Sequence, residues 1–142
     1  MCNMRRPVTG EMLNIYYNVK SKKKEGTRLI GVVPRALYKG EIYEIFITDE
    51  KDAKPDGLIT NYAILGHFEV KDAGLIRTGD KVSVANKEVG KIVGYAPCKV
   101  LRAPDQAIIH IFATNDKIVT SEDLHLKLGD QITFTPIDTE YK

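Results

Sequence analysis

Short runs of β-branched and aromatic residues recur along this chain about every ten to fifteen residues, and glycine, proline, asparagine or aspartate closes each run. Residues 41–48 are the clearest case, because they combine isoleucine, tyrosine and phenylalanine with no breaker. Helical signal is confined to an N-cap-like opening at Thr120, which leaves room for about one turn before Gly129. We therefore predict an all-β fold, in which the apolar residues are buried by pairing strands.

The strands that we expect lie at residues 8–19, 28–33, 41–48, 61–70, 81–85, 88–95, 107–114 and 131–136. A hairpin loop is expected at residues 20–26, and a longer charged loop at residues 49–57. This spacing predicts a small closed or partly open β-barrel of about eight short strands with little helix, and a β-sandwich is the alternative. No shift in composition marks a boundary, so we expect residues 1–142 to form a single domain.

Two of these strands begin in the same way. Gly79 and Asp80 precede one alternating run, and Gly129 and Asp130 precede another. Glycine permits a positive φ in the turn, and the aspartate side chain can accept nearby backbone N–H groups. We interpret the pair as a weak internal repeat that is informative about fold and not about function.

Residues 61–70 alternate in a way that predicts two faces. One face should enter the core and carries Tyr62, Ile64, Gly66, Phe68 and Val70. The less apolar face carries Asn61, Ala63, Leu65, His67 and Glu69. His67 and Glu69 are therefore expected side by side on the outer face.

Composition excludes several classes of protein. A net charge of +2 is too small to indicate a nucleic-acid partner. No apolar run approaches the roughly 18 residues that a membrane span needs, and the N-terminal residues lack the apolar segment of a secretory signal. We therefore expect a soluble, cytoplasmic protein. Exposed strand edges are compatible with a homodimer.

Lysine is in local excess from Lys20 to Lys24. Clustered ammonium groups can bind a polyanion by releasing counterions. Without a longer basic stripe or an aromatic platform, the run favours a solvated loop that protects a strand edge. Cys2 and Cys98 form no disulfide framework, and the three histidines lack paired metal-ligand spacing, so we expect neither a metal nor a cofactor.

The order of motifs over about residues 43–135 resembles the sorbitol (glucitol) IIA component of the sugar phosphotransferase system. The motifs that carry the resemblance are Ile45-Phe46-Ile47, Ala53-Lys54-Pro55-Asp56-Gly57-Leu58, Tyr62 to Val70, Thr78-Gly79-Asp80, Ile92-Val93-Gly94, Ile108 to Phe112 and Gly129 to Phe134. The resemblance implies a small β-rich phosphocarrier, which takes a phosphoryl group on histidine from the general phosphocarrier protein. By position the acceptor falls on His67, or on Gly66 if the alignment has a one-residue gap. Where that family has two histidines around a cysteine, this chain has Gly66-His67-Phe68.

The residues themselves allow the same chemistry at His67. A neutral imidazole is nucleophilic, and Glu69 could hold its second nitrogen in the required tautomer. A histidine on the outer face of a strand is, however, more often a packed surface residue. His110 alternates with apolar residues and is interpreted as half-buried and satisfied, whereas His125 is expected to be exposed. The carboxylate pairs Glu41/Glu44 and Glu122/Asp123 are interpreted as parts of charged loops, because nothing beside them would raise a pKa.

Three hypotheses follow. The first in rank is a non-catalytic domain that binds a small molecule or another protein and is related to the sorbitol IIA component. The second is a phosphohistidine carrier that uses His67, with Glu69 beside it; only under this hypothesis is the protein catalytic. The third is a polyanion-binding module that acts through Lys20 to Lys24.

Overall fold

The computed structural model describes residues 5–17, 20–31, 34–97 and 109–137 of the chain. Ten strands and one short helix fall within these residues, so the all-β prediction is confirmed. The first five strands are β1 (Val8–Ile15), β2 (Lys20–Arg28), β3 (Pro34–Leu37), β4 (Ile42–Thr48) and β5 (Leu58–Asp72). They are followed by β6 (Gly74–Arg77), β7 (Lys81–Val84), β8 (Lys87–Pro97), β9 (Ile109–Thr114), α1 (Ser121–Leu124) and β10 (Gln131–Thr135).

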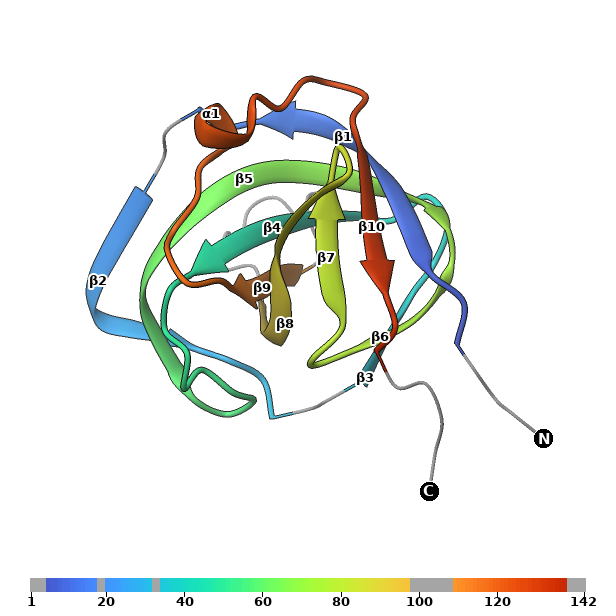
Figure 1. Cartoon of the computed structure of the whole chain (residues 1–142). Coiled ribbons are helices and arrows are strands. Elements are labelled where there is room, and N and C mark those ends of the chain that lie inside the picture. The colour runs from blue at the N-terminus through green and yellow to red at the C-terminus, as the bar shows by residue number, and fades with distance from the viewer. Residues whose placement is uncertain (1–4, 18–19, 32–33, 98–108, 138–142) are drawn as a thin grey trace.

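Seven strands pair in a closed ring. The order is β1-β10-β7-β8-β9-β4-β5, and β5 then pairs with β1 and closes the ladder. All neighbours are antiparallel except β4 and β9, which run parallel. Figure 1 shows the ring, with β2 lying outside it beyond β5. The strand pairing therefore matches the closed form of the predicted barrel. β5 and β8 are longer than the short strands that we expected.

The segment from residue 20 to residue 26 is not the predicted hairpin loop, since it belongs to β2. The edge of β5 explains the difference, because it is long enough for two partners. Its first half pairs with β2, from Lys20 opposite Ala63 to Arg28 opposite Leu58. Its second half pairs with β1, which closes the ring. Backbone pairing along β5 thus overrides the weak strand propensity of a lysine-rich segment.

A β-bulge in β5 reverses the predicted faces of residues 62–65, so that Tyr62 and Ile64 lie on the outer face. His67 faces outward, and Phe68 and Val70 face inward, as predicted. Opposite Ile45 and Phe46 of β4, β5 places Gly66 and Ile64, so Leu65 is an extra residue. Leu65 therefore points into the core and is fully buried, although we expected it on the outer face. Gly66 makes this geometry possible, because a Cβ there would lie 2.0 Å from the carbonyl oxygen of Asn14. Its φ of +153° also disfavours other residues.

Two apolar clusters result. The larger one fills the ring with inward side chains from its strands, among them Tyr43, Phe68, Tyr95 and Phe134, all at most 1% exposed. The smaller cluster lies on the other face of β4, β8 and β9 and comprises Leu29, Phe46, Ile59, Tyr62, Val93, Ala96 and Phe112. The segment after β2 closes over it, because the Ile30 N–H donates to the Tyr95 carbonyl of β8 over 2.6 Å.

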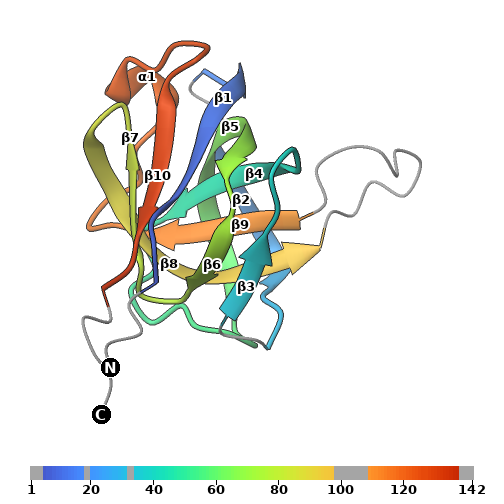
Figure 2. The same cartoon turned by 90° about the vertical axis from the view of Figure 1, so that its right-hand side faces the viewer.

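The ends of the ring are covered by the remaining elements. Figure 2 shows α1 at one end of the ring. The helix begins with a capping box between Thr120 and Asp123, and Leu124 packs into the larger cluster. The Ser121 hydroxyl donates to the Leu65 carbonyl over 2.8 Å and so ties this helix to the bulge. The two-stranded sheet of β3 and β6 contributes Leu37 and Ile76 to the same cluster. No helix in the described ranges has the length and apolar character required to cross a bilayer.

The two Gly-Asp turns have the same hydrogen bonds, as the repeat predicted. Asp80 accepts the Arg77 N–H on its side chain over 3.0 Å and donates its own N–H to the Arg77 carbonyl. Asp130 does the same with Lys127, over 2.8 Å at its side chain. Gly79 and Gly129 have the same positive φ, near +90°. These contacts form the local turn from which β7 and β10 start.

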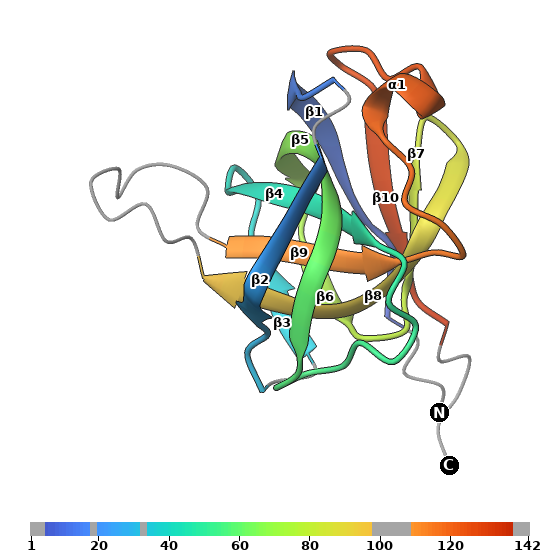
Figure 3. The ribbon, with the colours of Figure 1, turned by 90° about the vertical axis from the view of Figure 1, so that its left-hand side faces the viewer.

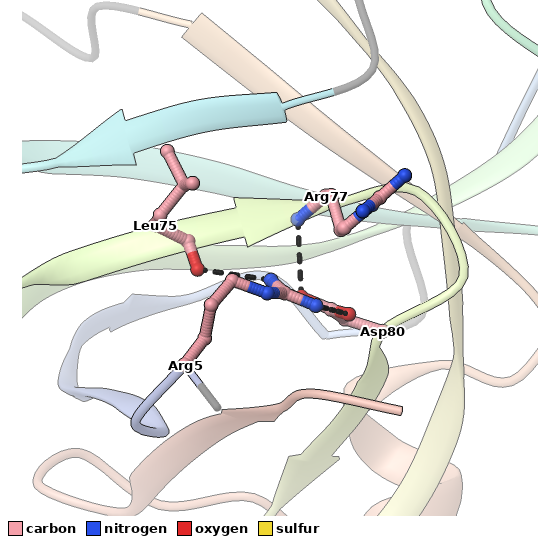
Figure 4. Close-up of polar contacts among 4 residues, drawn as sticks. All are labelled: Arg5, Leu75, Arg77 and Asp80. Atoms are coloured by element: carbon pink, nitrogen blue, oxygen red, sulfur yellow. Dashed lines mark hydrogen bonds and ion pairs between the residues drawn. The ribbon is translucent and has the colours of Figure 1, made fainter. Parts of the chain in front are cut away.

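Asp80 has a further partner that Asp130 does not share in the described structure. The guanidinium of Arg5 binds both carboxylate oxygens of Asp80, at 2.7 and 2.8 Å, and donates to the Leu75 carbonyl (Figure 4). Asp80 is 1% exposed and the Arg5 side chain 12% exposed. This bidentate pair fastens the segment before β1 to the first turn.

Candidate functional site

A row of polar side chains crosses the outer face of the ring beside the smaller apolar cluster. Glu44 on β4 lies directly opposite His67 on β5 and directly opposite His110 on β9. All three side chains are mostly buried, with 14% of Glu44, 21% of His67 and 18% of His110 exposed. Strand pairing therefore brings together two histidines that are 43 residues apart in the sequence, on either side of one carboxylate.

Glu44 uses one oxygen for each histidine. Nε2 of His110 lies 2.6 Å from Oε1, and Nε2 of His67 lies 3.1 Å from Oε2. The contacts mean that each ring carries its proton on Nε2 and donates it to the carboxylate. In this tautomer the lone pair of each neutral ring is on Nδ1. A carboxylate that holds one nitrogen of an imidazole makes the other nitrogen more basic and fixes the ring plane.

The surroundings of the two histidines differ. The Asn14 side-chain amide lies 3.2 Å from Nδ1 of His67 and donates to it, and the Tyr16 ring lies 5.6 Å from the His67 ring. His110 stacks on Phe46, with ring centroids 4.6 Å apart and planes at 28°. Within the described residues Nδ1 of His110 has no hydrogen-bond partner. His67 is therefore held from β1, and His110 is held by the apolar cluster.

The bulge in β5 determines which residues share this face. Because Leu65 is the extra residue of the bulge, the alternation of faces shifts by one position. Ile64 before the bulge and His67 after it therefore both project outward. A regular strand with Ile64 outward would turn His67 into the core. The bulge thus places His67 in line with Glu44 while Phe68 fills the ring.

The electrostatics centre on Glu44. Burial alone would raise the pKa of this carboxyl, but the hydrogen bonds from His110 and His67 and the charge of each ring when protonated outweigh burial. They lower the pKa of Glu44 from 4.5 to about 2. Burial, followed by the negative charge of Glu44, raises the pKa of Tyr16. Glu44 is therefore a fixed negative charge throughout the neutral pH range.

Glu69, which we expected beside His67, has a different role in the described contacts. Its Oε1 lies 3.3 Å from the ammonium of Lys71, and Lys71 also lies 3.7 Å from Glu11. The described hydrogen bonds of His67 are with Glu44 and Asn14. His110 is half-buried, as predicted, although only its Nε2 has a partner among the described residues, and His125 is exposed, as predicted.

Sequence reasoning missed Glu44. We interpreted Glu41 and Glu44 as parts of a charged loop. That interpretation is wrong for Glu44, which lies in β4, is mostly buried and has a strongly lowered pKa. The alternation of residues 42–48 places Glu44 and Phe46 on the outer face of the strand. That signal was available, but the register of β4 against β5 and β9 was not, and only the register pairs Glu44 with the histidines.

The arrangement suits proton or group transfer at an imidazole better than metal binding. The two Nε2 atoms approach different oxygens of Glu44 and do not converge on one point. Among the residues that the structure describes, no group of three or more histidine, cysteine, aspartate or glutamate side chains could hold a metal ion. A neutral imidazole with its N–H on a buried carboxylate is instead the usual arrangement for a nucleophile or general base.

Two other sequence features lie beyond this description. Cys2 and Cys98 fall outside the described residues, and the side chains from Lys20 to Lys24 are not described. The polyanion hypothesis therefore stays a prediction from sequence.

The chain was compared with known proteins and families. No curated protein and no solved structure matches it. One family model matches residues 2–135, which include every strand described above. The chain belongs to DUF6917, a family of unknown function.

Proposed function

We propose that this protein is a phosphoryl carrier that accepts a phosphoryl group on Nδ1 of His67. The observation that carries the proposal is the hydrogen bond from Nε2 of His67 to the buried carboxylate of Glu44. It places the lone pair of a partly exposed ring on Nδ1, which can attack phosphorus once the Asn14 amide moves aside. The resemblance of the chain to the sorbitol IIA component also points to His67 as the acceptor. Glu44 takes the role that we expected for Glu69, which is to hold the second nitrogen of that ring.

The transfer step is balanced at His67. The Nδ1 lone pair attacks the phosphorus of a phosphohistidine or similar donor, the new N–P bond forms, and the donor nitrogen leaves with its bonding electrons. The His67 ring becomes cationic, because it keeps its Nε2 proton. Glu44 lies 3.1 Å from that proton and stabilises the positive charge as it develops. Reversal of the step passes the phosphoryl group to the next acceptor.

Asn14 has a specific role in this scheme. Its amide occupies the position at Nδ1 that an incoming phosphorus must take, and Asn14 is exposed at the end of β1. A modest rotation of the side chain would free Nδ1 and let the same amide donate to a phosphoryl oxygen. The Asn14 contact therefore holds the resting ring and becomes a phosphoryl ligand after transfer.

The direct test uses phosphoenolpyruvate with the general phosphotransferase proteins as donor. We expect an acid-labile phosphoryl group on the wild-type protein, and less of it after short incubation with the Glu44→Gln variant. His125→Asn is the matched control, because His125 is exposed, and asparagine tolerates its left-handed φ of 56°. Absence of acid-labile label on wild-type protein, with both this donor and a small phosphoryl donor, would falsify the proposal.

A second candidate is a protein-binding role without phosphoryl transfer. Leu13 and Tyr17 flank the segment that contacts His67, and they are 41% and 61% exposed. Exposed apolar side chains beside a polar row are typical of a protein interface. The ring is packed with its own side chains, so a ligand inside it is not proposed. A partner that binds equally well to wild type and to His67→Gln, without label on either, would favour this candidate.

A further inference from the structure

Glu44 makes the same contact with His110 as with His67, and the His110 contact is the shorter. Both rings donate from Nε2, both have the remaining lone pair on Nδ1, and both side chains are about one-fifth exposed, 18% and 21%. The two rings lie on strands that flank β4 on opposite sides. With respect to the carboxylate, the two histidines are therefore equivalent.

We infer that Glu44 supports two phosphoryl acceptors, Nδ1 of His67 and Nδ1 of His110, only one of which is phosphorylated at a time. This inference rests on the proposed function and extends it to a second ring.

Phosphoryl transfer to Nδ1 of His110 forms and breaks the same kinds of bond as transfer to His67. The Nδ1 lone pair forms the N–P bond, the donor's leaving group takes the electron pair of the broken bond, and the ring becomes cationic with its proton on Nε2. Nε2, which carries that proton, lies 2.6 Å from Oε1 of Glu44. Stacking on Phe46 fixes the ring plane, so Nδ1 keeps one direction of attack. Among the described residues, no side chain holds this nitrogen as Asn14 holds Nδ1 of His67.

A single carboxylate explains why the two states exclude each other. Glu44 carries one negative charge and can compensate one imidazolium in this mostly buried row. A second cationic ring would have no anionic partner among the described contacts of the row, since Glu69 is bound to Lys71. The two phosphoryl groups would also repel each other across the width of three strands, about 10 Å.

The rings also point to different surroundings. His67 lies next to Asn14 of β1 and to Tyr16, which follows β1, and His110 lies next to Phe46 and the smaller apolar cluster. Their Nε2 atoms meet at Glu44, so their Nδ1 atoms face away from each other and a direct transfer between the rings is excluded by this geometry. Two acceptors with separate surroundings suit two different protein partners.

The test uses phosphoramidate, a small donor that transfers its phosphoryl group and releases ammonia. It is applied to wild type, His67→Gln, His110→Gln, the double variant, Glu44→Gln and the His125→Asn control. Intact mass counts the phosphoryl groups per chain, and phosphorus NMR with site-specific fragmentation locates them. Circular dichroism and urea unfolding identify any variant that does not fold, and His110→Asn replaces His110→Gln in that case.

We expect wild type to take up at most one phosphoryl group per chain, distributed over the two rings. Each single histidine variant should still take up one group, and the double variant none. Glu44→Gln should slow labelling of both rings by roughly 10- to 100-fold while the fold is kept, which a purely structural role of Glu44 would not do.

Failure of this inference is distinguishable from failure of the proposed function. Label on wild type but none on folded His67→Gln would overturn the inference and leave His67 as the carrier. Two phosphoryl groups on one wild-type chain would overturn the inference that only one of the two rings is phosphorylated at a time. Absence of label on wild type with both donors, phosphoramidate and the phosphoenolpyruvate system, would overturn the inference together with the proposed function.

Discussion

Two mostly buried carboxylates, Asp80 and Glu44, are held in contrasting ways. Asp80 is bound by the guanidinium of Arg5 and by a backbone N–H at the first Gly-Asp turn. Glu44 is bound by the imidazoles of His67 and His110. Arginine stays charged at every pH that a folded protein meets, whereas an imidazole exchanges its proton near neutrality.

The contrast separates a structural ion pair from a candidate chemical site. Arg5 and Asp80 form a bidentate ion pair that attaches the segment before β1 to the body of the protein (Figure 4). Glu44 has imidazole partners, whose second ring nitrogen can form a bond to another atom. Both carboxylates are mostly buried, so the chemistry of the partner, and not burial, distinguishes the two roles.

The largest effect is expected from removing the cation at Asp80. Arg5→Met should lower the free energy of unfolding by about 3–5 kcal/mol, because it leaves a buried aspartate without its charge partner. Urea unfolding would measure it, and the loss should be equal at pH 6 and pH 8. Arg6→Met is the matched control, since Arg6 makes one exposed hydrogen bond to the Ala73 carbonyl. Equal losses in Arg5→Met and Arg6→Met would show that the ion pair with Asp80 stabilises the protein no more than an exposed arginine hydrogen bond does.

Glu44→Gln should have a smaller and pH-dependent effect. A pKa lowered from 4.5 to about 2 corresponds to about 3 kcal/mol of stability at neutral pH. Because the pKa of the folded state is the lower one, this stability is complete above about pH 5 and is lost as the pH falls from 4.5 towards 2.

The difference in unfolding free energy between wild type and Glu44→Gln should therefore shrink between pH 5 and pH 2.5. Glu69→Gln provides the comparison, since Glu69 pairs only with partly exposed Lys71 in the described contacts and should change stability by less than about 1 kcal/mol. A constant difference across this pH range would contradict the account of Glu44.

Gly66→Ala tests whether the Glu44 row depends on the bulge. A Cβ 2.0 Å from the Asn14 carbonyl oxygen forces β1 and β5 apart, which should cost about 1–3 kcal/mol. It should also change the environment of His67 and leave that of His110 nearly unaltered. Carbon–proton NMR of the histidine rings would record this. Equal changes at both rings would show that the bulge does not position His67 alone.

The smallest effect is expected at the second turn. Asp130→Ala removes the side-chain acceptor for the Lys127 N–H, and no arginine pair is lost with it in the described structure. We expect a loss of about 0.5–1.5 kcal/mol, measured by the same unfolding experiment. A loss as large as that of Arg5→Met would mean that the turn hydrogen bonds, and not the guanidinium, account for the stability at Asp80.

The strands that the sequence predicts best are those with dense β-branched and aromatic residues. Residues 41–48 were predicted almost to the residue, since the structure gives Ile42–Thr48. The hairpin loop at residues 20–26 was wrong, because pairing to β5 decides that segment and local propensity does not. The outward position of Leu65 was wrong because a bulge shifts the alternation, and only Gly66 hints at it in the sequence.

The candidate site could be predicted only in part. His67 was identified because alternation placed it outward and a family resemblance marked its position. Its partner Glu44 was not identified, since that required the register of three strands whose residues are far apart in the chain. Sequence periodicity reports which face a residue occupies, but register depends on bulges and tertiary pairing.

The closed order of the ring also has a consequence for how the chain reaches its native state. β10 (Gln131–Thr135) fits between β1 (Val8–Ile15) and β7, so the first strand of the ring lacks one neighbour until the last has been synthesised. Contacts between such distant segments slow folding, and in the meantime the edges of β1 and β7 are open to other chains (Figures 1 and 3). A ribosome-bound chain that ends before residue 131 should therefore be the most aggregation-prone form of this protein.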